Sequence, residues 1–186
     1  MSQAYYYLVA SLPTLSFEGK APFSCADFLK ECRSHLNDED FLRLEKAISA
    51  DEEMPLVIPG MVGAWVTFNR NVRNEIAILR ASRGMASRAL TSSADIHGER
   101  QYVPQLTELV EGASKATDPL TAEKILDAAR WRHLEELVTG HYFDLEVLIV
   151  YALKLKILDR YVVIASSAGK EIYEEYKKVK IPEPAA

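Results

Sequence analysis

The sequence predicts an all-α fold, a helical bundle of about six or seven helices. Two consecutive segments in the C-terminal third favour this fold most, because each begins with a capping residue and repeats apolar residues at three- and four-residue spacing. The composition agrees, since 48% hydrophobic and 26% charged residues in a chain of 186 are typical of a globular protein with a buried core.

The N-terminal region starts with an ambiguous segment and continues with a clear helix. The run Ala4–Leu12 is too short and too aromatic for periodicity to decide between strand and helix, and Pro13 ends it. Ser24 and Asp27 form a box-like cap for a helix that ends near His35. One stripe of this helix is apolar and comprises Cys25, Phe28, Leu29, Cys32 and Leu36.

The cysteines of the chain, Cys25 and Cys32, stand seven residues apart in this helix. At a rise of about 1.5 Å per residue they would lie about 10 Å apart, which is beyond the reach of a disulfide. We expect two core thiols in a reducing cytoplasm, because a redox or metal role needs closer spacing.

A second short helix and a connector come next. Asn37 and Asp38 cap the helix, which forms a hairpin with the first one. The segment Asp51–Gly60 then interrupts the pattern with two prolines and a glycine, and we expect Leu56–Ile58 to lie against the core. The inward face of the second helix comprises Phe41, Leu44, Ala47 and Ile48.

A third helix is predicted from Met61 to Arg83, with an apolar stripe that includes Trp65 and Phe68. Arg73 nearly overlaps Arg80 in projection along the axis, so a basic strip flanks the apolar stripe. We predict that this strip binds a partner; an alternative is that its arginines pair with internal acids or lie solvated. The basic strip comprises Arg70, Asn71, Arg73, Asn74, Arg80 and Arg83.

The segment Met85–Gly98 is rich in small and hydroxyl residues and predicts a flexible boundary. Beyond it, the pattern from Leu106 to Ala113 indicates a short amphipathic helix. The sequence leaves open whether the two halves pack as one bundle or as two lobes. The predicted parts are an N-terminal helical lobe (1–84), the connector (85–98), a C-terminal helical lobe (99–180) and a disordered tail (181–186).

Two long helices form the C-terminal third. Asp118 caps the first with Pro119 at its first position, and Gly140 is placed to end it in a left-handed conformation. Asp144 starts the second, and a polar helix over Lys170–Lys180 extends or follows it. The second helix has a wide apolar face, which predicts a central strut with neighbours on more than one side. This face comprises Leu145, Leu148, Ile149, Ala152, Leu155, Leu158, Val162 and Val163.

Charge and motifs exclude several classes of function. A net charge of −5 argues against a general nucleic-acid binder, because that affinity depends on neutralising phosphates. The run Tyr5–Leu12 is too short to span a bilayer, no basic region precedes it as in a signal peptide, and Leu145–Val163 is interrupted by charges. The sequence contains no phosphate-binding glycine loop, nucleophile elbow, metalloprotease motif or zinc-ribbon spacing. We therefore expect no enzyme, no cofactor and no transmembrane segment.

Only weak candidates for chemistry remain. His133 and Glu136 lie one turn apart and could share a metal with His141, but a di-metal bundle needs such pairs from two helices. We therefore predict no metal site and no catalytic residue. A further set of ionisable residues could act as acids or bases, although nothing orients it: Asp95, His97 and Glu99.

Three segments together resemble a bacterial family that is encoded beside the genes of V-type (A/V-type) ATPases: AYYYLVASLPTLSFEGKAPFS, FNRNVRNEIAILRASR and GHYFDLEVLIVYALKLKILDRY. More distantly, NRNVRNEIAILRASRG and YALKLKILDRY are similar to repeated helical elements of the C-type subunit of those rotary ATPases, whose eukaryotic counterpart is the d-type subunit. In that C-type subunit, helical lobes form a funnel that sits on the proteolipid ring and receives the central stalk. This chain is shorter and would supply only part of the funnel.

The resemblance implies a non-catalytic structural or assembly subunit that links the central stalk to the proteolipid ring of an ion-transporting ATPase. The basic strip would bind acidic or polar groups of the stalk or the ring, and the protein would be cytoplasmic or peripheral on the cytoplasmic face of the inner membrane. A free-standing helical adaptor or regulator is the first alternative. A helical metal-dependent hydrolase that uses His133, Glu136 or His141 is the second.

Overall fold

The structure is a computed structural model that describes residues 4–50, 60–82 and 104–165. Over these ranges it contains seven helices and no strand, which confirms the predicted all-α fold. The segments 51–59, 85–98, 170–180 and 181–186, on which predictions were made, lie outside the described residues. The helices are α1 (Tyr6–Ser11), α2 (Cys25–His35), α3 (Asp38–Ser49), α4 (Gly60–Ser82), α5 (Pro104–Ser114), α6 (Pro119–Leu137) and α7 (Leu145–Ala165).

Local sequence signals set the helix ends. The Ser24 hydroxyl accepts a hydrogen bond from the backbone N–H of Asp27 (3.1 Å) at the start of α2, which confirms the predicted cap. The side chains of Asn37 and Asp118 cap α3 and α6 in the same way. Gly140 has the left-handed conformation (φ 91°), although α6 ends at Leu137, three residues before this turn.

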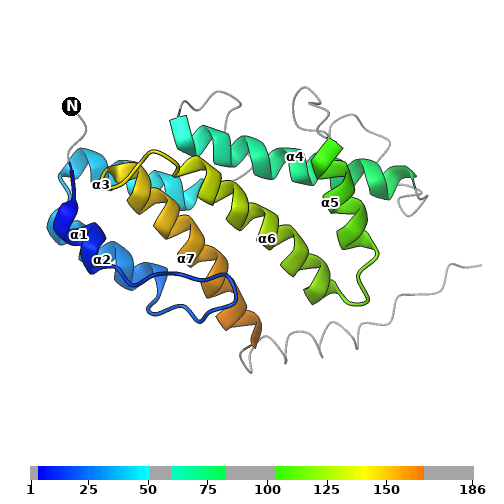
Figure 1. The fold of residues 1–186 in the computed structure, drawn as a ribbon, viewed down its shortest axis with the longest axis horizontal. Helices are drawn as coiled ribbons and strands as arrows, with labels where there is room; N and C mark the ends of the chain where they lie inside the picture. The colour runs from blue at the N-terminus through cyan, green and yellow to red at the C-terminus, as the bar shows by residue number, and fades with distance from the viewer. Residues whose placement is uncertain (1–3, 51–59, 83–103, 166–186) are drawn as a thin grey trace, which may run out of the picture.

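Helix α7 is the central strut of the described fold, as predicted. It contacts α2 and α3 on one side and α6 on the other, and Figure 1 shows it running antiparallel to α6. Leu148, Ala152 and Leu155 are completely buried, whereas Val162, which was predicted to belong to the same apolar face, is 57% exposed. Neither α7 nor another described helix is long and apolar enough to cross a membrane.

Two apolar cores share helices from both halves of the sequence. The larger core surrounds α7 and contains Leu134 from the C-terminal half of α6. The smaller core lies between α4, α5 and the first half of α6, with Val72 and Leu126 among its members. Because α4 and α6 each contribute to both cores, these two helices hold the smaller core against the larger one.

Both cysteines are free, as predicted. Cys32 is fully buried in the larger core, whereas Cys25 is partly exposed at the start of α2. Burial raises the pKa of the Cys32 thiol to about 12, and burial likewise raises the pKa of Cys25. Because the thiolate is the reactive form, Cys32 behaves as a packing residue at neutral pH.

The α6–α7 contact provides a test of the larger core. Replacement of the fully buried Leu134 by alanine should lower the free energy of unfolding by about 2–5 kcal/mol, because it leaves a cavity between packed helices. The measurement is the urea midpoint followed by circular dichroism. Leu120→Ala, at a 41% exposed position of the same helix, is the matched control and should change stability by less than about 0.5 kcal/mol. Equal losses for the two variants would contradict this core.

Candidate functional site

The structure separates the predicted basic strip into exposed and buried members. Arg73 and Arg80 are exposed and lie two turns apart on one face of α4. Arg70 and Asn74, one turn apart, are buried with 4% and 3% exposure, and Arg70, Arg73 and Asn74 all have interaction partners. Asn71 is partly exposed, and Arg83 lies outside the described residues.

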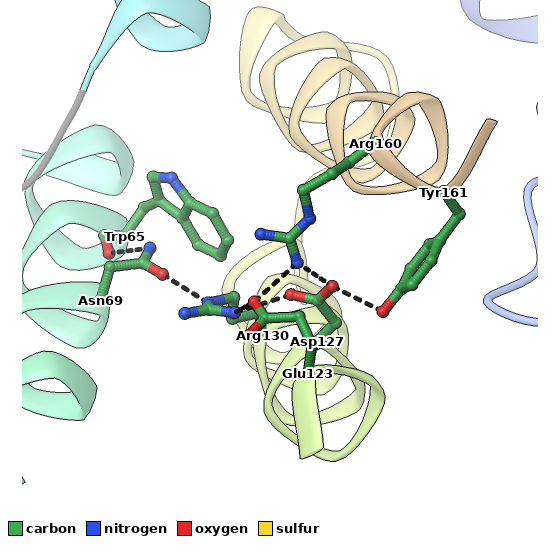
Figure 2. Close-up of polar contacts among 7 residues, drawn as sticks. All are labelled: Trp65, Asn69, Glu123, Asp127, Arg130, Arg160 and Tyr161. Atoms are coloured by element: carbon green, nitrogen blue, oxygen red, sulfur yellow. Dashed lines mark hydrogen bonds and ion pairs between the residues drawn. The ribbon is translucent and has the colours of Figure 1, made fainter. Parts of the chain in front are cut away.

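A fully buried carboxylate, that of Asp127 on α6, lies at the centre of a polar cluster. Its Oδ1 accepts a hydrogen bond from Nη1 of Arg130 (2.7 Å), and its Oδ2 accepts one from the Tyr161 hydroxyl (2.7 Å). Arg160 on α7 donates to the same Oδ2, as Figure 2 shows. These donors compensate the loss of hydration that a buried carboxylate would otherwise suffer.

The cluster extends to a second carboxylate and to α4. Oε1 of Glu123 lies 3.1 Å from Nη1 of Arg130 and 3.0 Å from Nη2 of Arg160. Nε of Arg130 donates to the side-chain oxygen of Asn69 (2.9 Å), and the Asn69 amide donates to the carbonyl of Trp65 (2.9 Å). We call this network the Asp127 cluster, and it connects α4, α6 and α7 (Figure 2). Its members are Trp65, Asn69, Glu123, Asp127, Arg130, Arg160 and Tyr161. Two guanidinium groups balance two carboxylates in it.

Electrostatics keep the donors of this cluster protonated. Burial raises the pKa of Tyr161 well above its usual range, and the hydrogen bond to Asp127 raises it further, so the phenol stays a donor. Burial alone would lower the pKa of Arg160, but its hydrogen bond to Asp127 and the nearby charges raise the pKa above its ordinary value. The Tyr161 phenol and the Arg160 guanidinium therefore both stay protonated donors at neutral pH.

A pocket of about 320 Å³ opens beside the Asp127 cluster, between α4, α6 and α7. Four cationic side chains and one carboxylate, that of Asp127, line it, although the whole chain carries a net charge of −5. The amide of Asn69 and apolar side chains form the rest of its wall. This basic pocket is lined by Ala50, Trp65, Val66, Asn69, Arg73, Asp127, Arg130, Leu153, Lys156, Ile157 and Arg160.

Helix α7 places two of these cations one turn apart, at Lys156 and Arg160. Nζ of Lys156 donates to the carbonyl of Ile48 in the last turn of α3 (2.6 Å). This contact leaves the positive charge of Lys156 without a carboxylate within ion-pair distance among the described residues. The basic pocket therefore carries more positive charge than the Asp127 cluster balances.

Sequence reasoning identified one residue of this pocket and missed the residues of the Asp127 cluster that also line it. Arg73, from the predicted strip, lines the pocket, but Asp127, Arg130 and Arg160 were not singled out. The available signal was the spacing of Glu123, Asp127 and Arg130, which places two acids and one arginine on one face of a helix. This spacing is common on solvated helices, so it does not by itself indicate a buried cluster.

The weak metal candidates do not come together. His133 lies 3.8 Å from Glu136, whereas His141 is bonded to Asp144 (2.5 Å) in the turn before α7. In the described part of the chain, the set with metal-ligand spacing is His141, Asp144 and Glu146, and Arg43 approaches Glu146 to 3.5 Å, where its charge opposes a bound cation. Asp95, His97 and Glu99 lie outside the described residues.

His133 instead lines a second cavity of about 680 Å³ between α4, α5 and α6. Its ring stacks on Phe68 with 4.2 Å between the ring centroids. Its Nε2 is buried and makes no hydrogen bond in the described structure. Burial lowers the pKa of His133, although Glu136 partly opposes this shift, so the neutral imidazole is favoured.

Comparison with known proteins identifies one family. Residues 60–179 match the family model described as "Protein of unknown function (DUF2764)". The match covers more than half of the chain and includes all of α4 to α7, and thus every residue of the Asp127 cluster. No curated protein and no solved structure matches.

The Asp127 cluster gives a stability prediction. Asp127→Asn should lower the free energy of unfolding by about 1.5–3 kcal/mol, because it weakens charge-assisted hydrogen bonds while Glu123 still balances part of the guanidinium charge. Tyr161→Phe, which removes one donor, should cost about 0.5–1.5 kcal/mol. Chemical denaturation of both variants measures these losses. An Asp127→Asn protein as stable as the parent would show that the cluster does not hold these helices together.

The lowered pKa of His133 predicts a pH dependence. Below pH 6.5 the unfolded chain binds a proton at His133 more readily than the folded chain, so stability falls as the pH drops from 6.5 through the lower folded pKa. His133→Gln removes this proton uptake, and its urea midpoint should therefore fall less between pH 7.5 and pH 5.5 than that of the parent. Parallel curves for the two proteins would contradict the assignment.

Proposed function

We propose that this chain, which belongs to the DUF2764 family, is a non-catalytic structural or assembly subunit of a bacterial V-type ATPase, similar in role to the C-type subunit. In this role it links the central stalk to the proteolipid ring, from the cytoplasmic face of the inner membrane. The resemblance in sequence suggests these partners. The basic pocket is the observation that carries the proposal, because it offers a charged, concave contact surface on a rigid helical frame.

The pocket and the exposed arginines of α4 form a surface that suits acidic groups. Arg73 belongs both to the basic strip and to the pocket wall, so the two features are continuous. Guanidinium groups bind carboxylates with two parallel hydrogen bonds, which fixes the orientation of the partner as well as its distance. Such contacts suit a stalk or ring protein that must be held at a defined angle.

The frame around the pocket suits a mechanical role. Helices α4, α6 and α7 are 23, 19 and 21 residues long, and the Asp127 cluster joins all three. Packed helices are stiff, and a buried network of ion pairs resists sliding because any displacement leaves a charge unpaired. A force applied at the pocket would therefore pass into the larger core. Hydrolysis of ATP would remain on other parts of the ATPase.

A free-standing adaptor that binds an unrelated acidic protein is the alternative that the same pocket supports. The hydrolase alternative has less support. The second cavity does collect His133 and Glu136, and the pKa of His133 is shifted. However, His141, the third predicted ligand, does not line this cavity and is paired with Asp144, so the predicted metal set is not assembled.

The test is recovery of partners from membranes of the native host with a tagged chain, followed by mass spectrometry after a moderate salt wash. We expect stalk or ring proteins of the V-type ATPase. The double charge reversal Arg73→Glu with Arg80→Glu should reduce their recovery by about tenfold or more, because it replaces attraction by repulsion at two exposed positions. Helicity and melting temperature should stay close to those of the parent.

Arg132→Glu is the matched control, because Arg132 is an exposed arginine of α6 that lines the second cavity instead of the basic pocket. It should leave recovery unchanged. Recovery of unrelated proteins in place of ATPase components would favour the adaptor. A large fall in the melting temperature of the double variant would mean that Arg73 and Arg80 stabilise the fold and do not form a contact surface.

A further inference from the structure

We infer that the basic pocket binds one carboxylate of a partner protein together with the apolar side chain next to it. In chemical terms the ligand is an acidic residue flanked by an apolar one. This inference rests on the proposed function for the identity of the partner, but the site itself is argued from the residues that line it. The relevant properties are the charge of the pocket, the N–H groups of Arg130 and Arg160 that make no hydrogen bond among the described residues, and the apolar wall.

The pocket has an excess of positive charge. Arg130 and Arg160 are balanced by Asp127 and Glu123, and Lys156 adds a positive charge whose hydrogen bond among the described residues goes to a backbone carbonyl and not to a carboxylate. A concave surface with an excess of one charge concentrates the field and attracts the opposite charge. The pocket therefore favours an anion.

The guanidinium groups of the pocket are held in place and still offer donors. Asn69 and Asp127 fix Arg130, while Asp127 and Glu123 fix Arg160 through its Nη2. Nη2 of Arg130 and both Nε and Nη1 of Arg160 make no hydrogen bond within the described part of the chain. Donors that are already held in place lose little entropy when they bind, which favours a carboxylate at this position.

Part of the pocket wall is apolar. Trp65, Val66 and Ile157 line the same pocket and are 9%, 2% and 6% exposed, so only a small part of each side chain remains open to water. A bare oxyanion would pair with the cations alone, whereas a carboxylate beside an aliphatic side chain would also cover this remaining apolar surface. A volume of about 320 Å³ is at the lower end of the range for ligand pockets, which suits one or two side chains of a partner.

A single negative charge suits the site better than a doubly charged phosphate. Asp127 and Glu123 lie within the cluster that forms one side of the pocket, and each would repel a dianion about twice as strongly as a carboxylate. Because of this repulsion, the pocket suits the single charge of an acidic side chain better than a phosphate group. Inorganic phosphate is therefore an informative competitor in the test.

The test is nuclear magnetic resonance of the full chain labelled with 15N at tryptophan. The chain has two tryptophans: Trp65 lines the basic pocket, while the indole N–H of Trp131 donates to Glu135 (2.9 Å). The probe is an acetylated and amidated leucine–glutamate–leucine tripeptide. The matched neutral probe replaces the glutamate by glutamine, and inorganic phosphate is the third ligand.

The glutamate tripeptide should shift the indole signal of Trp65 in a saturable way and leave that of Trp131 in place. The glutamine tripeptide should bind at least about tenfold more weakly, since the charge-assisted pair that it lacks is worth about 1.4 kcal/mol or more. Phosphate should also bind at least about tenfold more weakly, because Asp127 and Glu123 repel its second charge and it does not cover the apolar wall. Added salt should weaken binding of the glutamate tripeptide. Equal binding of the glutamate and glutamine probes, or tighter binding of phosphate, would overturn the inference.

Variants locate the site. Lys156→Gln keeps a donor for the Ile48 carbonyl but removes the charge, and it should weaken binding of the glutamate tripeptide by about fivefold to tenfold. Arg132→Gln, outside the pocket, should have no effect. Unchanged binding by Lys156→Gln with native helicity would overturn the inference.

The sequence next to the pocket supplies a further control. Asp51, Glu52 and Glu53 directly follow the lining residue Ala50 in sequence. If the tripeptide binds only after these three residues are changed to amides, the carboxylate belongs to the chain itself and the inference of a partner is overturned.

The experiments can contradict the proposed function and the inference about the pocket independently of each other. Tripeptide binding without recovery of ATPase components would support the site and remove the ATPase as its partner. Recovery of ATPase components without tripeptide binding would support the proposed function and overturn the inference about the pocket.

Discussion

The carboxylate of Asp127 is the constraint on which the arrangement of the three longest helices depends. It is completely buried, so it must be compensated, and its compensating donors come from two helices. Tyr161 and Arg160 tie it to α7, while Arg130 continues the network to Asn69 on α4. A shift of any of these helices would leave a charge or a donor unpaired in the interior, at a cost greater than that of an imperfect apolar contact. The position of Asp127 thus specifies the geometry of the basic pocket as well.

The position of Asp127 along α6 explains why the two cores form one unit. Leu126, its immediate neighbour, belongs to the smaller core, while Trp131 and Leu134 belong to the larger one. The polar cluster therefore lies where α6 passes from one core to the other. Apolar packing is non-directional and would tolerate several orientations of the smaller core. The directional bonds of the cluster select one of them, because Arg130 reaches Asn69 from a single register of α4 against α6.

Sequence reasoning succeeded where the signal is local. The caps at Ser24, Asn37 and Asp118 depend on residues within a single turn, so they could be read directly and match the structure. The basic strip was only partly informative, since a helical projection gives angles around α4 but does not say which sides α5 and α6 cover. Arg70, which the projection placed in the basic strip, is buried in the structure. Asp127 could not be recognised because its partners Arg160 and Tyr161 lie 33 and 34 residues later, on another helix.

Magnitudes indicate which part of the basic surface can hold a partner. An exposed ion pair contributes about 0–1 kcal/mol, because water and salt screen it and the long side chains lose entropy. Arg80, on the open face of α4, would therefore affect the rate of encounter more than the affinity. Charge-assisted hydrogen bonds in a partly desolvated pocket contribute about 1.5–3 kcal/mol each, and the apolar wall adds to this. Because α4, α6 and α7 share the Asp127 cluster behind this pocket, the place where a partner would bind most strongly is also where the frame is held most firmly.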